Sequence, residues 1–425
     1  MDGKVVPIPY GRAGRGRKVK GLVGSFQLMK SLNKSLILNV IRTDGPISRA
    51  EIAKKTRLTP PTVTNLVNDL LESRLVQESD LGVSTGGRKP IMLKINSEAF
   101  QVIGIDVGVS HIKVIVATLD AAIIDSLYIK VIQPLDKESL IKLLNESIRR
   151  IMEKAALRKE RVIGIGVGMH GLVNPDRGVG IFAPNFNLHD IPIRESLESE
   201  WDLPVEVEND VRAMALGESW FGHGQGLEDF ICLNVGMGVG AGIILNQELF
   251  RGTSYTAGEL GHTTIDVEGP TCACGNDGCL QALTAGPAIA ARAQRGLRMG
   301  RKSRISEFVQ GDWSQMTGET VYQAACQGDE FAREILADTG RYLGIGIANF
   351  INTLNPQKVI IGGGVSKSGD FIMETLKETV ETRALNISAK AIAIQTAKLG
   401  DDATAIGAAT LVLKKLFLPN IPHKR

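Results

Sequence analysis

The sequence predicts a two-lobed α/β body that follows a small winged helix-turn-helix domain. Residues 29–97 carry three short helical patterns and then a hairpin pattern. Residues 101–120 and 229–246 share one design, a strand, a glycine turn and a second strand. A chain of 425 residues is too long for one ordinary core, so two or three domains are expected. The boundaries we predict are a disordered basic tail over 1–24, a head over 25–97 and a body over 98–425.

The bulk composition excludes several classes of protein. Hydrophobic residues make up 43% of the chain, charged residues 22%, and the net charge is only +3, which is typical of a soluble protein. No apolar run approaches the roughly 20 residues that a membrane helix needs, and the first residues lack the apolar segment of a signal peptide. We therefore expect a cytoplasmic protein, in which cysteine thiols stay reduced.

The modest net charge hides an asymmetry along the chain. Residues 1–20 carry a net charge of +5, residues 21–97 carry another +5, and the remainder carries −7. A basic head on an acidic body is typical of a protein that presents one end to a polyanion such as DNA. A solvated surface with a disordered basic tail is the alternative explanation of the same charges.

The head begins with two predicted helices. Asp44-Gly45-Pro46 ends the first helix, near residues 29–43, and a capping box of Ser48 and Glu51 begins the second, which runs to about Thr56. The expected buried side chains of the two helices are Leu32, Leu36, Ile37, Val40, Ile41, Ile52 and Ala53.

The third helix has the features of a DNA-reading helix. Thr59 is its expected cap, Pro60 and Pro61 occupy its first turn, and Val63, Leu66, Val67, Leu70 and Leu71 form its apolar stripe. The opposite face offers short polar side chains that can bond base edges or phosphates. Two helices with a tight turn between them, the second polar on its outer face, favour a helix-turn-helix.

A hairpin pattern after the third helix predicts the wing, with two cations on its flank. Protein contacts are the alternative use of such a head, but charge, face polarity and wing together favour operator DNA. The predicted DNA-binding residues are Arg49, Thr62, Thr64, Asn65, Asn68, Arg88 and Lys89.

The body contains three glycine clusters. Two of them lie between strands, so neither the Rossmann nor the P-loop pattern of strand, glycine turn and helix applies. The third, Gly362–Gly369, follows another strand. The repeated design suggests a duplicated α/β domain with a cleft between its lobes. Glycine turns let backbone amides approach phosphate, although they also make ordinary tight turns.

The segment 258–283 concentrates metal-binding residue types. His262, Cys272, Cys274 and Cys279 match a closed tetrahedral site for structural Zn²⁺, whereas three unrelated buried thiols are the alternative. A metal would fix the ring of His262, whose second nitrogen could then act with Glu259 on a polyol. With four protein ligands the ion has no open position, so its expected role is structural.

These residues together resemble the ROK family of repressors, open reading frames and kinases, over about residues 25–415. The motif Glu259-Leu-Gly-His262 with "CACGNDGCLQ" is similar to the family signature. The sequence "VEND", which ends at Asp210, is similar to the family's Asn-Asp pair. The segments "GVGMHGLVNPDRG" and "APNFN" are similar to the family's sugar-pocket loops.

The resemblance implies an actin-like fold of the sugar kinase/Hsp70 type, with two lobes around a sugar cleft and a zinc loop over residues 259–281. It implies zinc ligation by the His–Cys set above, and in family kinases the residue that matches Asp210 is the catalytic base. The sugar-binding residues that it implies are Asn185, Asn209, Asp210, Glu259 and His262, to which we add Gln281.

The phosphate turns depart from the kinase pattern. The first turn, Asp106-Val-Gly108-Val109-Ser110, has a valine where kinases have a second glycine. The second turn, Gly236-Met237-Gly238, has methionine where kinases commonly have threonine. Gln281 stands where the family has glutamate, and it retains hydrogen bonding without the charge.

We therefore predict a non-catalytic, sugar-responsive repressor of a carbohydrate operon, with xylose favoured as effector from the general likeness of the head to xylose repressors. Its expected partners are operator DNA, a monosaccharide and a second copy of the chain, as a homodimer or a dimer of dimers. An ATP-dependent sugar kinase with an accessory head is the alternative, since phosphoryl transfer depends on positioning phosphates. A scaffold whose head binds another protein is the third possibility.

Overall fold

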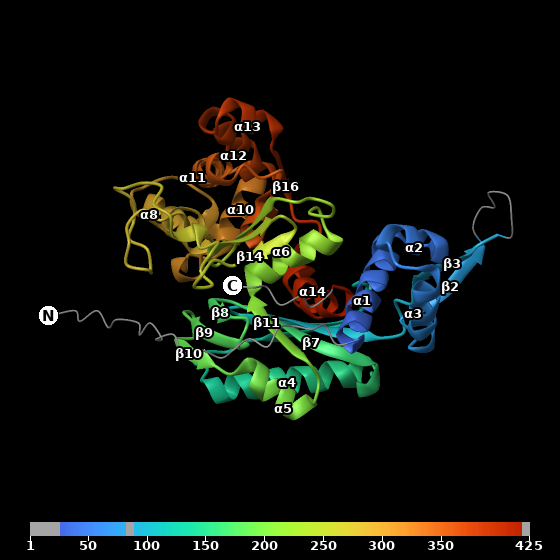
Figure 1. Ribbon diagram of the computed structural model, residues 1–425. Helices are drawn as coiled ribbons and strands as arrows, with labels where there is room; N and C mark the ends of the chain where they lie inside the picture. The colour runs from blue at the N-terminus through green and yellow to red at the C-terminus, as the bar shows by residue number, and fades with distance from the viewer. Residues whose placement is uncertain (1–25, 82–88, 419–425) are drawn as a thin grey trace, which may run out of the picture. The chain divides into compact units, whose positions relative to one another are not determined.

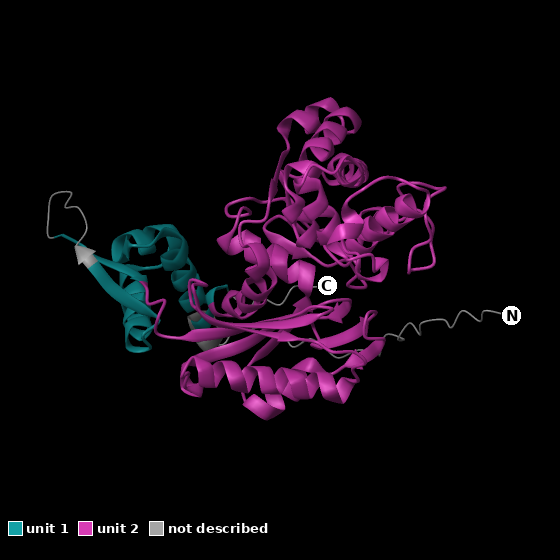
Figure 2. Ribbon diagram, turned by 180° about the vertical axis from the view of Figure 1, so that it is seen from behind, with its two compact units in different colours: residues 1–94, 417–425 teal, residues 95–416 magenta. Residues whose placement is uncertain are grey.

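The computed structural model describes residues 26–81 and 89–418, and it divides into two compact units (Figure 2). Unit 1 comprises residues 1–94 and 417–425, and unit 2 comprises residues 95–416. The predicted tail over 1–24 lies outside the described residues, as do Arg88 and the glycines before it in the wing. Among the helices that the structure describes, none is both long and apolar enough to cross a membrane.

Unit 1 has the predicted three helices and hairpin, with a short additional strand that completes a sheet of order β1-β3-β2. Ser48 and Glu51 form the expected capping box, and the Thr59 hydroxyl caps the third helix by accepting the Thr62 amide at 3.4 Å. The elements are α1 (Phe26–Asp44), β1 (Ile47–Ser48), α2 (Arg49–Thr56), α3 (Pro60–Glu72), β2 (Val76–Leu81) and β3 (Ile91–Ile95).

The core of unit 1 differs slightly from the predicted stripe. Ile37, Leu38 and Ile41 are the buried residues of α1, whereas Leu36 and Val40 are only partly buried. The buried face of α1 therefore includes Leu38, which was not predicted, and fewer of the predicted residues. This is the face against which α2 and α3 pack. Phe417 also belongs to unit 1: its ring is buried and lies 5.7 Å from the guanidinium carbon of Arg42.

Unit 2 contains two five-stranded sheets of matching topology (Figure 1). Each has a central strand with two antiparallel strands on one side and two parallel strands on the other, which is the duplication that the sequence predicts. The first sheet, in the order β11-β7-β4-β5-β6, consists of β4 (Gln101–Val107), β5 (His111–Thr118), β6 (Ile123–Lys130), β7 (Val162–Met169) and β11 (Val205–Asn209). The second, in the order β14-β13-β12-β15-β16, consists of β12 (Phe230–Val235), β13 (Val239–Leu245), β14 (Glu248–Phe250), β15 (Lys358–Gly362) and β16 (Ala393–Thr396).

Helices and a small antiparallel sheet complete the two lobes. In the first lobe, α4 (Lys137–Lys154) and α5 (Ile193–Trp201) cover the outer face of the sheet (Figure 1). The small sheet is formed by β8 (Leu172–Asn174), β9 (Val179–Ala183) and β10 (Leu188–Ile191). The second lobe adds α7 (Leu280–Thr284), α8 (Gly286–Arg298), α9 (Ile305–Phe308), α10 (Gly318–Cys326), α11 (Glu330–Leu354), α12 (Asp370–Arg383) and α13 (Asn386–Ala391).

Two helices, α6 (Asp210–Phe221) and α14 (Ala403–Phe417), pack between the sheets through backbone contacts. A Cβ at Gly166 of β7 would overlap the Ala408 carbonyl of α14, and one at Gly407 of α14 would overlap the Ala213 carbonyl of α6. A Cβ at Gly242 of β13 would overlap the Ala215 side chain and crowd the Val211 carbonyl of α6. The lobes are therefore joined as sheet, helix, helix, sheet, with no room for larger residues at these contacts.

Candidate functional site

The start of α6 fixes the Asn209-Asp210 pair. Asn209 is the N-cap: its Oδ1 accepts the amides of Val211 at 3.0 Å and Arg212 at 3.1 Å. Its Nδ2 donates to the Gly171 carbonyl at 3.0 Å and to Asp210 Oδ1 at 2.8 Å. All four hydrogen-bonding positions of the amide are thus used inside the protein. In this arrangement Asn209 orients the carboxylate of Asp210.

Asp210 lies within electrostatic range of two other acidic residues, Asp106 at the end of β4 and Glu259. We call these three residues the carboxylate cluster. Burial raises the pKa of Asp210 most, and the charges of Asp106 and Glu259 also raise it, whereas the Val211 amide and the Arg212 charge lower it; the net pKa is about 7. A carboxylate with such a pKa, whose Oδ2 receives no hydrogen bond from any described residue, favours hydroxyl donors as ligands.

Close backbone packing holds Glu259 and His262 beside the second sheet. The Gly258 carbonyl accepts the Ala241 amide of β13 at 2.8 Å. Gly258 has a φ of +95°, and a Cβ there or at Gly261 would overlap carbonyl oxygens of β13. Both glycines are therefore required for the loop to lie on the strand, which brings Glu259 to the carboxylate cluster.

The predicted metal ligands are brought together. His262, Cys272, Cys274 and Cys279 place one ligand atom each within 4.8 Å of one another. Cys272 Sγ lies 3.7 Å from His262 Nδ1, and Cys274 Sγ lies 3.7 Å from Cys279 Sγ. These separations are far too long for a disulfide but match the edge of a tetrahedron with metal–sulfur bonds of about 2.3 Å, roughly 3.8 Å. The geometry fits a four-coordinate ion.

Tight turns close this loop around the four ligands. The Cys272 amide donates to the Asn276 carbonyl at 2.7 Å, and the Gly275 amide donates to the Cys272 carbonyl at 2.9 Å. Since Nδ1 of His262 faces Cys272, Nε2 is the nitrogen left for another partner. Gln281, the last residue of the loop, accepts the Val239 amide at 3.0 Å and so ties the loop to the second glycine turn.

The first glycine turn is covered by a side chain that the sequence analysis did not single out. The imidazole of His111 lies against Gly108, so closely that a Cβ at Gly108 would overlap the ring. Its Nε2 is 3.4 Å from Asp106 Oδ2, and its ring stacks on Tyr128 with 5.2 Å between centroids. In the second turn Met237 is 61% exposed. Ser110 is also exposed, and Gly236 and Gly238 close the second turn through a hydrogen bond of 2.9 Å.

The predicted DNA-contact residues of α3 share its outer face. Thr64, Asn65 and Asn68 are exposed and Thr62 is half-buried, opposite the buried stripe. The Thr64 hydroxyl donates to the Pro60 carbonyl at 2.9 Å. Among the predicted cations, Arg49 forms an ion pair with Glu78 at 3.4 Å, and Lys89 is exposed. The face thus offers mainly amides and hydroxyls.

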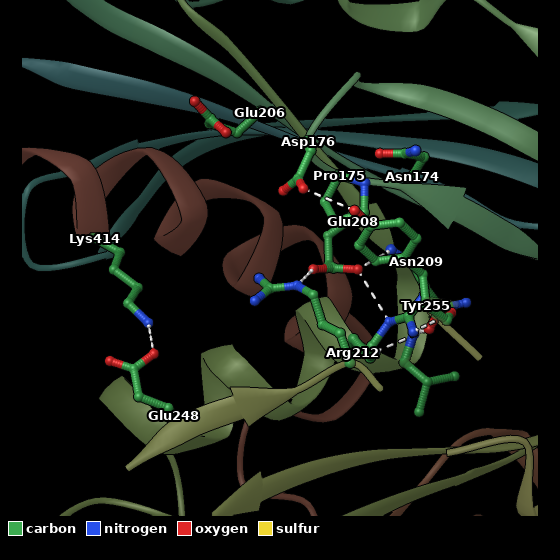
Figure 3. A network of polar contacts seen from close by, with 12 residues as sticks. Asn174, Pro175, Asp176, Glu206, Glu208, Asn209, Arg212, Glu248, Tyr255 and Lys414 are labelled. Atoms are coloured by element: carbon green, nitrogen blue, oxygen red, sulfur yellow. Dashed lines mark hydrogen bonds and ion pairs between the residues drawn. The ribbon is translucent and has the colours of Figure 1, made fainter. Parts of the chain in front are cut away.

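Sequence reasoning missed a buried ion-pair cluster next to Asn209 (Figure 3). Glu208 is fully buried and lies 3.0 Å from Arg212 Nε and 2.6 Å from Arg251 Nε. The available signal was a glutamate inside the apolar strand "VEVEN", since such a residue is seldom buried without a partner. Asn185, by contrast, is exposed, and no described residue links it to the carboxylate cluster.

Two cavities of the structure lie away from the predicted site residues. A cavity of about 360 Å³ is lined by Gln101, Thr118 and Arg161 among others, and one of about 420 Å³ by Phe308 and Gln315 among others. Neither lining contains a predicted site residue. The candidate site is therefore identified by its chemistry, the carboxylate cluster with the adjoining His–Cys set.

Comparison with known families and sequences assigns both parts of the chain. The model described as "ROK family" matches residues 102–415, and the one described as "MarR family" matches residues 31–82. The "Xylose repressor" of Caldicellulosiruptor bescii is 34% identical over 395 residues, which is 93% of this chain and 98% of the relative. The "DNA-binding transcriptional dual regulator NagC" of Escherichia coli K12 is 32% identical over 93% of this chain and 95% of the relative.

Solved structures agree with this assignment. A ROK family transcriptional regulator described as a homologue of the E. coli MLC protein has a TM-score of 0.81 and 28% identity, covering 92% of this chain and 97% of the other. A ROK family glucokinase from Streptomyces griseus, in complex with glucose and AMPPNP, has a TM-score of 0.65 and 30% identity. It covers 73% of this chain and 98% of its own. The fold is therefore the ROK actin-like fold with an N-terminal winged-helix domain.

The raised pKa of Asp210 predicts a pH-dependent gain in stability on Asp210→Asn. An asparagine keeps the acceptor for the Val211 amide and removes the ionisation that the folded protein opposes. Because the folded pKa is about 7 and the ordinary value 3.8, the cost of ionisation is fully present above about pH 7 and fades toward pH 4. The melting temperature of the variant should exceed the wild-type value at pH 8, and the gain should shrink at pH 6 and again at pH 5. A gain that does not vary with pH would contradict this.

The His–Cys geometry predicts that Cys274→Ser loses a bound metal. Wild-type protein should carry about one ion per chain, measured by inductively coupled plasma mass spectrometry after dialysis against a weak chelator. Cys326→Ser is the matched control, since Cys326 is an exposed cysteine of α10 outside the set. Equal metal content in all three proteins would refute the ligand assignment.

Proposed function

The chain belongs to the ROK family, and we propose that it is a sugar-responsive, DNA-binding repressor of carbohydrate utilisation genes. The observation that carries this proposal is the similarity to named repressors over 93% of the chain, which includes the helix-turn-helix unit. The domains that we propose are the DNA-binding head over 25–97 and the sugar-binding body over 98–425.

The sugar is proposed to bind at the carboxylate cluster. Asp210 Oδ2, Glu259 and His262 Nε2 can accept or donate hydrogen bonds to adjacent hydroxyls of a ring, and Asn185 and Gln281 are proposed at its edge. Neutral hydroxyl donors relieve the mutual repulsion of the carboxylates without adding charge. Xylose is the favoured effector, because one of the relatives reported above is named a xylose repressor and the head has a general likeness to xylose repressors.

We propose that the ion held by His262 and the three cysteines is Zn²⁺. Three thiolates and one imidazole form a donor set that suits zinc, and four protein ligands leave no open position for catalysis. The ion would fix the orientation of His262 and thereby present Nε2 to the sugar. Its role is therefore structural.

The kinase alternative is less supported. The imidazole of His111 lies on the first glycine turn, where a phosphate would need free backbone amides. The two lysines near the turns already have acidic partners: Lys113 pairs with Asp402 at 2.6 Å and Lys367 with Asp401 at 2.8 Å. Phosphoryl transfer needs such cations for the phosphates. We therefore assign Asp210 to sugar binding, without a role as catalytic base.

We further propose that the protein acts as a homodimer on operator DNA, so that two heads read two half-sites at a fixed spacing. One conformation of the dimer fits the operator and another does not. The sugar then acts because its affinities for these two conformations differ.

The function is tested by assaying the purified protein with monosaccharides, ATP and DNA. Calorimetry with xylose, glucose, N-acetylglucosamine and allose should show binding of at least one sugar, and that sugar should change the affinity for DNA from the protein's own promoter region. ADP release with Mg-ATP and the same panel should stay below about 1 s⁻¹, the low end of ordinary enzyme rates. Faster turnover would establish the kinase instead.

The head predicts two separable effects on DNA binding. Asn65→Ala with Asn68→Ala should weaken binding to the operator by about 1–3 kcal/mol and relax its sequence preference, since these amides face base edges. Lys89→Ala should instead lower the slope of log affinity against log salt by about one. Fluorescence anisotropy at several salt concentrations measures both.

The matched control for Lys89→Ala is Lys377→Ala, an exposed lysine of α12 in the body. Its salt slope should equal that of the wild type. An unchanged slope in Lys89→Ala would remove the wing flank from the interface, and unchanged operator affinity in the asparagine variant would remove α3.

A further inference from the structure

A continuous set of polar contacts joins the start of α6 to two loops, one from each lobe (Figure 3). Its centre is Glu208, which precedes the Asn209-Asp210 pair. Glu208 Oε1 accepts the Asn209 amide at 2.9 Å and meets Arg212 Nε at 3.0 Å, while Oε2 meets Arg251 Nε at 2.6 Å. A buried carboxylate with two guanidinium partners is costly to break, so this centre is rigid.

Arg212 extends the contacts to the loop that leads to Glu259. Its Nη1 donates to the carbonyl of Tyr255 at 2.7 Å. Tyr255 has a φ of +61°, in the left-handed region that a bulky residue seldom adopts. Such a conformation persists when surrounding contacts impose it, and it is more common at binding sites than elsewhere. The backbone of Tyr255 is thus held from the buried centre.

The side chain of Tyr255 crosses to the other lobe. Its hydroxyl donates to Asp176 Oδ2 at 2.7 Å, and Asp176 lies in the turn between β8 and β9, whose small sheet belongs to the first lobe. Arg194 anchors this turn: Nη1 donates to the Asp176 carbonyl at 2.7 Å and Nη2 to the Pro175 carbonyl at 3.0 Å. The same guanidinium pairs with Glu206 at 3.2 Å.

The two ends of the Tyr255–Asp176 bond are therefore fixed by partly or fully buried arginines, whereas the bond itself is exposed. A bond between two anchored loops can break without disturbing either anchor. The loop with Asp176 leads into β9 and Asn185, and the loop with Tyr255 leads to Glu259 and His262. The bond thus couples the segments that carry the proposed sugar contacts of both lobes.

We propose that Tyr255 is a positioning residue of the sugar site, and that its bond to Asp176 is a latch that holds the two lobes' binding loops together over a bound monosaccharide. This inference rests on the proposed sugar site at the carboxylate cluster. Glu208 and Arg212 set the position of the latch relative to Asp210, so that ligand binding and loop closure share one buried support.

The latch is tested with Tyr255→Phe, Asp176→Ala and the double variant, by calorimetry with the sugar that the wild-type protein binds best. Each single variant should weaken sugar affinity by about two- to tenfold, the range expected for one net hydrogen bond. The double variant should be no weaker than the singles, because both remove the same bond. Asp176→Asn retains an acceptor for the hydroxyl and should restore most of the affinity.

A purely structural role predicts different results. The latch makes the shift in melting temperature caused by sugar smaller in Tyr255→Phe, whereas a purely structural role lowers the melting temperature by the same amount with and without sugar. Tyr322→Phe, on α10, is the matched control and should retain the wild-type response. Wild-type affinity in Tyr255→Phe, or additive losses in the double variant, would overturn the latch and leave the sugar site intact. A wild-type protein that binds no sugar of the panel would overturn the proposed function, and the latch with it.

Discussion

The mutual repulsion of Asp106, Asp210 and Glu259 is the constraint on which the ligand chemistry depends. The start of α6 offsets part of it, since backbone amides and the positive end of the helix dipole face Asp210. Burial, and after it the remaining repulsion, raises the pKa of that residue. A ligand that brings hydroxyl hydrogens lowers this cost, whereas a polyphosphate without a cation increases it. At the proposed sugar site, the same three residues would therefore favour a polyol over an unaccompanied nucleotide.

The surrounding structure keeps these carboxylates close in spite of their charges. Asn209 and Glu208 hold the start of α6, and the glycines beside Glu259 hold its loop on β13. Glycine contacts also lock α6 to α14 and α14 to the first sheet. Within the body, a change in the spacing of the two sheets must then displace α14.

Local signals in the sequence predicted much of this arrangement. The caps at Ser48 and Thr59, the strand-turn-strand repeats and the metal set at 262–279 are each specified within a few residues, and the structure contains all of them. The family resemblance supplied Asp210 and Glu259, which lie 49 positions apart in the numbering yet interact electrostatically. The repeated design predicted that the two lobes are duplicates, but it did not predict the order of the strands in either sheet.

Contacts between distant segments could not be predicted in the same way. Tyr255, Arg251 and Asp176 have no motif that pairs them, and their partnership exists only because two loops from different sheets meet at the start of α6. His111 lies one residue beyond the first glycine turn, but only the structure shows its ring against Gly108. The resemblance implied a sugar-binding role for Asn209, and the structure shows that this residue caps α6. Asparagine is a common residue at the N-cap of a helix.

The most direct measurement is the affinity of the effector sugar for the free protein and for the protein saturated with operator DNA. If the carboxylate cluster and the DNA-binding head are coupled, the two sugar affinities must differ, and operator affinity with and without sugar must differ by the same factor. We predict a difference of fivefold or more, about 1 kcal/mol of coupling. Equal sugar affinities for free and DNA-bound protein would contradict the coupling of the two units.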